Sequence, residues 1–185
     1  GIARVLDLDV ATDRRSVRRH VGLVGPGTGI YDDLTVVENV AFFARASGAA
    51  DREVPAALER IGLTGRVRDT PVGRLSTGQR RRAALASMVV RRPQLWLLDE
   101  PHAGLDQEGR DVVDALVAAA SGAGATVLVA SHELERARRI TMRAVTLAGG
   151  IVHSDSFAAP LASDSAAAPL AQVAPVATKG GESVA

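Results

Sequence analysis

Two apolar runs of strand length, each followed by a pair of polar residues, restrict most strongly how this chain can fold. The first run covers residues 95–98 and is followed by Asp99 and Glu100. The second covers residues 126–130 and is followed by Ser131 and His132. Continuous apolar runs of this length are typical of strands buried on both faces of a parallel sheet. Helical patterns lie between them, and this alternation predicts an α/β fold with a parallel sheet.

Local signals place the other elements. Thr35 and Glu38 have the spacing of a capping box, so a helix should follow Thr35 and end near Gly48. Ser76 stands just before a long helical pattern that Pro93 ends. Further helices are expected at residues 12–19, 51–61, 108–120 and 133–140. Further strands are expected at residues 2–6 and 20–24, and a final hairpin at residues 144–147 and 151–152.

The bulk composition fits one domain without a membrane span. The chain has 185 residues and a net charge of +1, which gives no global attraction to nucleic acid. It has no cysteine, so disulfides and Cys-based zinc sites are excluded, and we expect a cytosolic protein. We predict one domain over residues 1–153, with a helical subdomain at about 34–92. Residues 154–185 are rich in Ala, Pro and Ser, and we expect a disordered tail there.

The carboxyl ends of the two buried strands are the candidate site, because ligands of open α/β sheets bind there. Asp99 can hold Mg²⁺, which prefers oxygen ligands, and Glu100 can orient or deprotonate a water. His132 can donate to a phosphate oxygen. Taken singly, these residues also fit a solvated strand end and a structural histidine.

Two further segments add to the candidate site. Residues 75–79 (Leu-Ser-Thr-Gly-Gln) open a helix, and helix N-termini bind phosphate through free N–H groups, although Ser76 also fits an ordinary cap. Residues 104–106 (Gly-Leu-Asp) form a tight turn in which Asp106 alone indicates only an Asx turn. The order of the four segments is more informative than any one of them.

In this order the chain resembles the ABC ATPases over residues 1–152. Residues 75–82 are similar to the family signature, 95–101 to the Walker B strand with its Glu and Pro, and 103–106 to the D-loop. Ser131 and His132 resemble the segment of the switch histidine. The resemblance implies a P-loop NTPase-like parallel sheet with an inserted helical subdomain, and the ligands ATP and Mg²⁺.

The resemblance also implies residue roles. Asp99 would hold Mg²⁺ through water, Glu100 would be the general base for the attacking water, and His132 would contact the γ-phosphate. Residues of the signature segment and D-loop would bind ATP held by a second ATPase subunit in a head-to-tail dimer, and Asp106 would link the two sites. These cofactor-binding residues are Ser76, Thr77, Gly78, Gln79 and Asp106.

Three departures from the family pattern stand out. The chain contains no G-x-x-x-x-G-K-[ST] loop, which in the family grips the β- and γ-phosphates. We expect an N-terminally truncated sequence that alone binds ATP poorly and does not hydrolyse it. Pro26 occupies the place where the family usually has Gln, and proline has no side-chain donor. Thr77 replaces the first glycine of the signature.

The type of ABC protein remains open between several classes. Residues 30–40 resemble the segment that docks a separate membrane subunit, which implies an ATPase on the cytoplasmic face of a membrane and no nucleic-acid partner. The surrounding sequence is similar to the heme exporters of cytochrome c maturation, with multidrug or antibiotic exporters as the alternative. A soluble ABC protein acting on ribosomes or DNA, and a degenerate partner of a heterodimer, are further alternatives.

Overall fold

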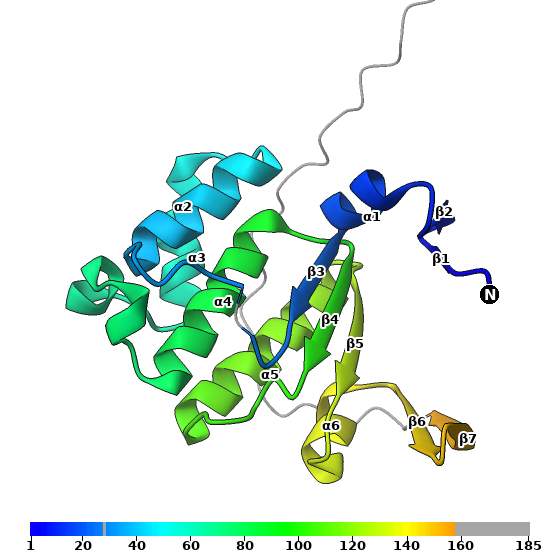
Figure 1. Cartoon of the computed structure of the whole chain (residues 1–185). Coiled ribbons are helices and arrows are strands. Elements are labelled where there is room, and N and C mark those ends of the chain that lie inside the picture. Colours follow the sequence, from blue (N-terminus) through cyan, green and yellow to red (C-terminus); the bar gives the residue numbers. More distant parts are fainter. Residues whose placement is uncertain (28, 158–185) are drawn as a thin grey trace, which may run out of the picture.

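The structure is a computed structural model, and it describes residues 1–27 and 29–157. A three-stranded parallel sheet forms its centre. Its strands are β3 (Val21–Val24), β4 (Leu95–Asp99) and β5 (Thr126–Ala130), with β4 in the middle. The pairing is parallel throughout, so all three strands end at one edge of the sheet (Figure 1). The predicted parallel α/β sheet is confirmed.

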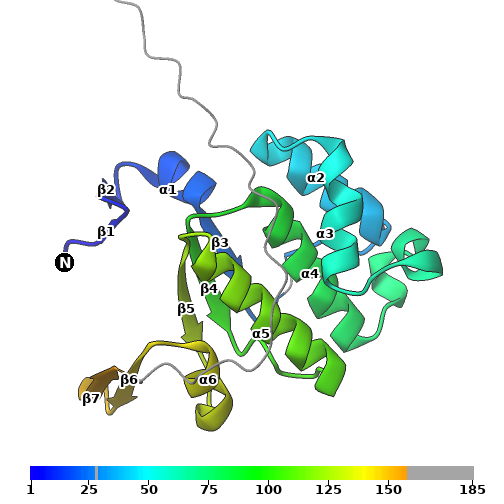
Figure 2. The same cartoon turned by 180° about the vertical axis from the view of Figure 1, so that it is seen from behind.

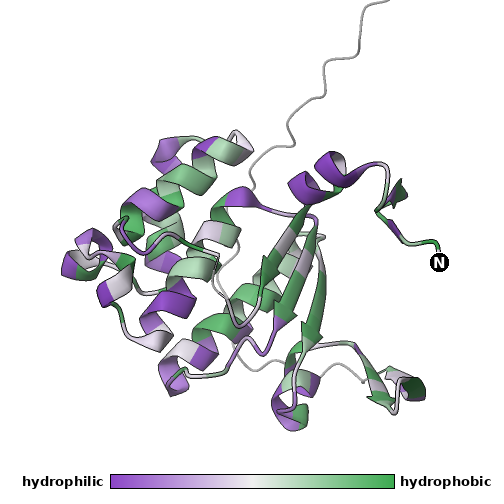
Figure 3. Cartoon of the chain, in the orientation of Figure 1, coloured by the Kyte–Doolittle hydropathy of each residue, from purple (hydrophilic) through white to green (hydrophobic). Residues whose placement is uncertain are grey.

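Helices cover one face of this sheet. The helices α4 (Thr77–Arg91) and α5 (Gln107–Gly122) lie on the same side of it, as Figures 1 and 2 both show. Trp96 and Leu98 of β4 are buried. Leu23 and Leu128 are 67% and 63% exposed on the other strands. The strands are strongly apolar (Figure 3), so an apolar surface is left uncovered among the described residues.

Residues 34–92, all of which the structure describes, contain helices and no strand apart from one isolated bridge. The elements are α2 (Val36–Ser47), η1 (Asp51–Glu53), α3 (Val54–Arg60), η2 (Gly65–Asp69), η3 (Val72–Arg74) and α4. The predicted capping box of α2 is confirmed: the Glu38 amide donates to Thr35 Oγ1 at 3.3 Å, and the Thr35 amide donates to Glu38 Oε2 at 2.8 Å. Gly48 ends the helix at φ 82°, in the left-handed region that glycine adopts without strain.

The core joins this helical region to the sheet. Fully buried side chains from α2 and from the segment after α3 pack in one cluster with residues of α4, α5 and the sheet, among them Val40, Ile61, Leu85, Leu98 and Val113. Gly22 of β3 lies so close to α4 that an added Cβ would stand 2.7 Å from Met88 Cγ. The strand and the helix are therefore held in direct contact.

The N-terminal elements extend one prediction. The strand expected at residues 2–6 is present as the shorter β1 (Arg4–Val5), but β2 (Leu8–Asp9), which pairs with it in a small antiparallel hairpin, is not predicted. The helix α1 (Arg14–His20) follows. The chain turns at Leu6 and Asp7, both with positive φ, and Leu6 gives no sequence signal for such a turn.

The C-terminal part follows the expected order. The elements are α6 (Leu134–Ile140), β6 (Arg143–Ala148) and β7 (Ile151–Phe157). The start of the expected tail at Ser154 is wrong by a few residues, because β7 continues through Phe157, which pairs with Arg143. An ion pair between Arg143 and Asp155 stabilises this pairing. The rest of the expected tail lies outside the described residues.

Among the helices that the structure describes, none combines the length and hydropathy that a bilayer crossing requires.

Candidate functional site

The tips of β4 and β5 lie side by side. Asp99 pairs with Ala130 at the end of the ladder, and the Glu100 amide donates to Ala130 O at 2.8 Å. The polar pairs that follow the two strands therefore meet, as the spacing of apolar runs predicts. Had the strands occupied opposite edges of the sheet, these groups could not act on one ligand.

Glu100 is the centre of this contact. Its Oε1 accepts from the His132 amide at 2.9 Å and lies 2.7 Å from His132 Nδ1, while Oε2 accepts from Ser131 Oγ at 3.2 Å. Its backbone has φ 48°, a conformation that costs a residue with a side chain on the order of 1–3 kcal/mol. Strain of this kind is concentrated at functional sites, and here it accompanies the turn that follows β4.

The contact shifts the pKa of both side chains. Burial acts to raise the pKa of Glu100, but the hydrogen bonds from His132 and Ser131 outweigh it, so this pKa lies below its ordinary value. The same hydrogen bond, together with the negative charge of Glu100, raises the pKa of His132. Glu100 is therefore held as a carboxylate at neutral pH, the form that a general base requires.

Asp99 is exposed at the end of β4, and its carboxylate has no hydrogen bond or salt bridge within the described residues. The loop after β3 passes beside it: a Cβ on Gly25 would stand 4.0 Å from Asp99 Oδ2, and Pro26 follows at the surface. The Asp99 carbonyl accepts from Arg81 Nη2 of α4 at 2.7 Å. Burial of that guanidinium lowers the pKa of Arg81.

The single carboxylate of Asp99 suits Mg²⁺ better than it suits a metal ion whose ligands all come from the protein. Among the described residues no group of three or more His, Cys, Asp or Glu side chains could hold a metal ion. Mg²⁺ usually keeps several waters and takes only one or two carboxylates together with substrate phosphates. A single free carboxylate at a strand tip fits that pattern.

The start of α4 forms a second capping box. The Gln79 amide donates to Ser76 Oγ at 3.2 Å, and the Ser76 amide donates to Gln79 Oε1 at 3.1 Å. Ser76 Oγ keeps its own hydrogen for another acceptor. An added Cβ at Gly78 would stand 3.1 Å from Gly104 O, and one at Gly104 would stand 3.4 Å from Thr77 Cγ2. The start of α4 thus packs closely against the turn that follows Glu100.

Asp106 is the N-cap of α5, and its Oδ1 accepts from the Gly109 amide at 2.8 Å. In this structure its side chain performs the ordinary capping function that its sequence context indicates. The structure brings Glu100, Ser131 and His132 into contact, and it places Asp99 beside them. At the start of α4, Ser76 and Gln79 bond each other rather than Glu100 or His132.

Several side chains around the site are not indicated by the sequence. His102 is buried behind the Glu100 turn and bonds Asp114 of α5. Arg110 of α5 reaches Glu133, the neighbour of His132. Arg81 supports the tip of β4. These contacts join residues far apart in the chain, so a motif search along the sequence has no signal for them.

Solved structures identify the fold. The fold is that of an ATP-binding cassette: one similar structure is a dimeric cassette bound to ADP and Pi, with TM-score 0.74 and 24% identity over 87% of this chain and 75% of that one. Another is an ATP-binding subunit of an ABC transporter, with TM-score 0.76 and 23% identity over 83% of this chain and 65% of that one.

The family follows from the sequence comparison. The family model described as ABC transporter matches residues 2–103, and the chain belongs to this family.

Similar curated proteins extend beyond the region that they share with this chain. An energy-coupling factor transporter ATP-binding protein of Symbiobacterium thermophilum is 41% identical over 80% of this chain and 54% of its own length. A cytochrome c biogenesis ATP-binding export protein of Vibrio cholerae is 36% identical over 67% of this chain and 60% of its own length. The chain therefore spans a little over half of each of these relatives.

Proposed function

We propose that this chain is part of the ATP-hydrolysing subunit of an ABC transporter. The observation that carries the proposal is the contact between Glu100 and His132 at the neighbouring tips of β4 and β5. A carboxylate and an exposed histidine in contact at the carboxyl edge of a parallel sheet are placed to act on one bound phosphate.

In this proposal each residue at the strand tips has a separate task. Glu100 accepts a proton from the water that attacks the γ-phosphate of ATP. His132 donates a hydrogen bond to that phosphate and, through its contact with Glu100, orients the base. Asp99 holds Mg²⁺, which when bound supplies positive charge that offsets the charge of the phosphates.

The start of α4 serves a second nucleotide. Ser76, Thr77, Gly78 and Gln79 form a helix N-terminus whose N–H groups and dipole favour an anion. We propose that they contact ATP held by a second subunit in a head-to-tail pair, with Asp106 near the junction. The free hydrogen of Ser76 Oγ supports this task, since the capping box uses only its acceptor capacity.

The uncovered face of the sheet supports the proposal that further polypeptide completes the site. Leu23, Leu97 and Leu128 stand in one row across the three strands, because the register pairs each with the next. Parallel sheets are normally covered on both faces, so a row of leucines with 67% and 63% exposure at its ends needs a cover. We propose that the segment carrying the phosphate-binding loop packs there.

We further propose a separate membrane subunit as partner, on the cytoplasmic face of a membrane. The names of the relatives support transport in general, and several of them, from Vibrio and from Xanthomonas campestris, are cytochrome c biogenesis export proteins. We therefore favour a heme exporter, with a multidrug or antibiotic exporter as the alternative.

ATP turnover by the complete gene product, purified with its membrane subunit, tests the proposal. We expect Glu100→Gln to lower kcat by about 10²- to 10⁴-fold, the usual contribution of a general base. Glu108→Gln is the matched control, since Glu108 is an exposed carboxylate in the first turn of α5. A Glu100→Gln protein that retains a third or more of its turnover would contradict the assignment.

One observation favours a non-catalytic member of a heterodimer as the second candidate. Pro26 lies in the loop beside Asp99, where it offers neither an amide hydrogen nor a side-chain donor. If the complete product binds ATP but shows no turnover, and Pro26→Gln restores none, this second function replaces the first.

A further inference from the structure

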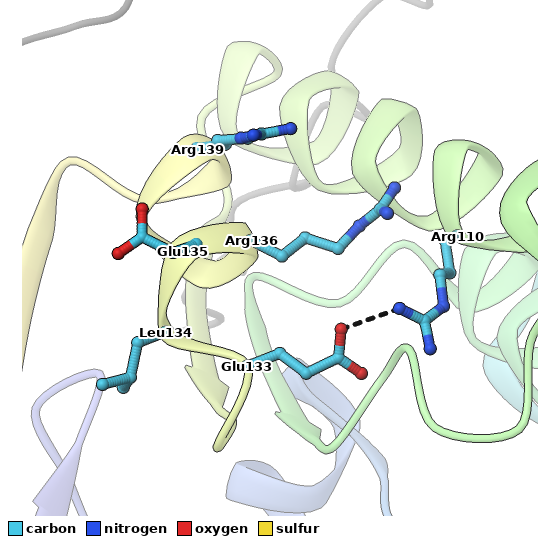
Figure 4. A pocket seen from close by; sticks show the side chains of 6 residues that line it. All are labelled: Arg110, Glu133, Leu134, Glu135, Arg136 and Arg139. Carbon is cyan, nitrogen blue, oxygen red and sulfur yellow. Dashed lines mark hydrogen bonds and ion pairs between the residues drawn. The ribbon is translucent and has the colours of Figure 1, made fainter.

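Helix α5 contacts both segments that carry the Glu100–His132 pair. One segment is the turn at residues 101–106, which follows Glu100 directly. The other is residues 133–136, which follow His132 directly and begin α6. Figure 4 shows Arg110 of α5 pointing toward Glu133, and Arg136 of α6 pointing back toward α5. An open surface hollow of about 300 Å³ lies between Arg110 of α5 and the segment that begins α6.

Arg110 forms the first bridge between the two segments. Its Nε donates to Leu105 O at 3.1 Å, and its Nη1 donates to Glu133 Oε2 at 2.8 Å. The side chains of Arg110 and Glu133 are 32% and 26% exposed, so both are more shielded than a typical surface pair. The planar guanidinium makes both bonds at once, which a lysine ammonium does with less geometric control.

Asp114 forms the second bridge, one helical turn further along α5. Its Oδ1 lies 2.8 Å from His102 Nε2, and its Oδ2 accepts from Arg136 Nη2 at 2.6 Å. His102 is only 1% exposed, so it is anchored in the core below the Glu100 turn. Residues four apart share one face of a helix, and the two bridges are therefore parallel.

We propose that Arg110 and Asp114 are positioning residues that hold His132 against Glu100. This inference rests on the proposed function, since the Glu100–His132 pair is its central feature. Neither residue touches Glu100 or His132. They act by fixing the segment that follows His132 to the turn that follows Glu100, with α5 as the rigid spacer between them.

The contact between Glu100 and His132 is too weakly held by its own surroundings to keep the two side chains together. His132 has a side chain that is 78% exposed, so packing does not hold it in place. An exposed pair contributes little by itself and pays the entropy of ordering two side chains. Two partly shielded bridges behind it reduce that entropy before any ligand arrives.

Hydrogen exchange of the His132 amide, measured on the complete gene product without nucleotide, tests the inference. That amide donates to Glu100 Oε1, so its protection reports the contact directly. We expect Arg110→Met to speed its exchange by roughly fivefold, the effect of losing one ion pair, while the amides of β4 and β5 keep their protection. Because ATP is absent, a failed ATPase assay would leave this result unaffected.

Arg138→Met is the matched control. Arg138 is likewise an arginine close to the site, but it lies in α6, and among the described residues its side chain pairs only with Glu135 of the same helix. We expect exchange at His132 to stay within twofold of the unsubstituted chain. Equal exchange in Arg110→Met and Arg138→Met would overturn the inference.

Two further variants keep the test decisive if Arg110→Met loosens the whole chain. Arg110→Lys retains the charge opposite Glu133 without the fork, and we expect an increase of about twofold at His132. The exchanged pair Arg110→Glu with Glu133→Arg restores an ion pair across the same gap, and we expect it to recover part of the protection. If the exchanged pair shows no recovery relative to Arg110→Glu alone, the bridge is not what positions His132.

Discussion

Substitutions of Ser76 can separate its contribution to stability, as the N-cap of α4, from its proposed contact with phosphate. Its capping box on α4 has a counterpart on α2, where Thr35 and Glu38 make the same two hydrogen bonds. Replacing an N-cap serine or threonine by alanine costs about 1 kcal/mol, within a range of about 0.5–2. We therefore expect Ser76→Ala and Thr35→Ala to lower the free energy of unfolding by similar amounts.

Aspartate caps helices about as well as serine, so Ser76→Asp should leave the free energy of unfolding within about 0.5 kcal/mol of the original value. It removes the hydroxyl hydrogen, however, and places a negative charge where the γ-phosphate would lie. Repulsion between the two anions should then abolish ATP-dependent pairing of the complete protein. Thr35→Asp, on the other capping box, should leave pairing nearly unchanged. It should lower stability, because its carboxylate would face Glu38 Oε2, which accepts from Thr35 Oγ1 at 2.7 Å.

Urea unfolding measures the first effect and sedimentation of the complete protein with and without MgATP measures the second. The capping argument fails if Ser76→Ala unfolds at the same urea concentration as the original protein. The phosphate argument fails if Ser76→Asp pairs with ATP as well as Thr35→Asp does. In that case Ser76 is an ordinary N-cap, which its sequence context also permits.

Three other predictions concern packing, pH and nucleotide binding. Gly22→Ala should cost about 1–3 kcal/mol in urea unfolding, because its Cβ would meet Met88 Cγ at 2.7 Å, whereas Gly27→Ala, with open space around it, should change little. Because folding raises the pKa of His132, the contact stabilises the folded chain fully below pH 6.5, the ordinary pKa of histidine, and this stabilisation is lost as pH rises through the folded-state pKa. Because folding lowers the pKa of Glu100, the contact stabilises the folded chain fully above pH 4.5, the ordinary pKa of glutamate, and this stabilisation is lost as pH falls through the folded-state pKa. The stability difference between the original chain and Glu100→Gln should therefore be largest between about pH 4.5 and 6.5 and shrink on both sides, and a difference that grows toward pH 9 would contradict the contact. By calorimetric titration, the 185-residue chain alone should show no micromolar affinity for ATP, because it lacks the phosphate-binding loop.

The sequence predicts most elements of this fold because their signals are local. The capping residues Thr35 and Ser76 fix where α2 and α4 begin, and the apolar runs fix β4 and β5. The first hairpin escapes prediction because Leu6 turns with a positive φ that its residue type disfavours. The end of β7 escapes it because residues 154–157 have little apolar character, and only their pairing with β6 makes them a strand.

The candidate site is predicted in part for the same reason. Asp99, Glu100 and His132 follow strands that can be recognised from sequence, so their meeting at one edge follows from parallel pairing. The links through α5 do not follow, since Arg110 lies 23 positions from Glu133 and nothing in the helical pattern marks it as a bridge. The contact of Arg81 with the tip of β4 is likewise set by the packing of α4 on the sheet.

The structure separates residues that the fold alone explains from those that need a chemical reason. Ser76 and Asp106 cap helices, and Gly78 has a backbone carbonyl 3.1 Å from where a Cβ would stand, so each would be favoured in a protein without any ligand. Glu100 is different: its φ of 48° costs on the order of 1–3 kcal/mol, and the hydrogen bonds it gains come from Ser131 and from the exposed His132. An exposed ion pair contributes at most about 1 kcal/mol, so the pair with His132 does not by itself offset that cost. A strained residue that presents a carboxylate at the carboxyl edge of the sheet therefore supports the proposal that Glu100 and His132 have a chemical function.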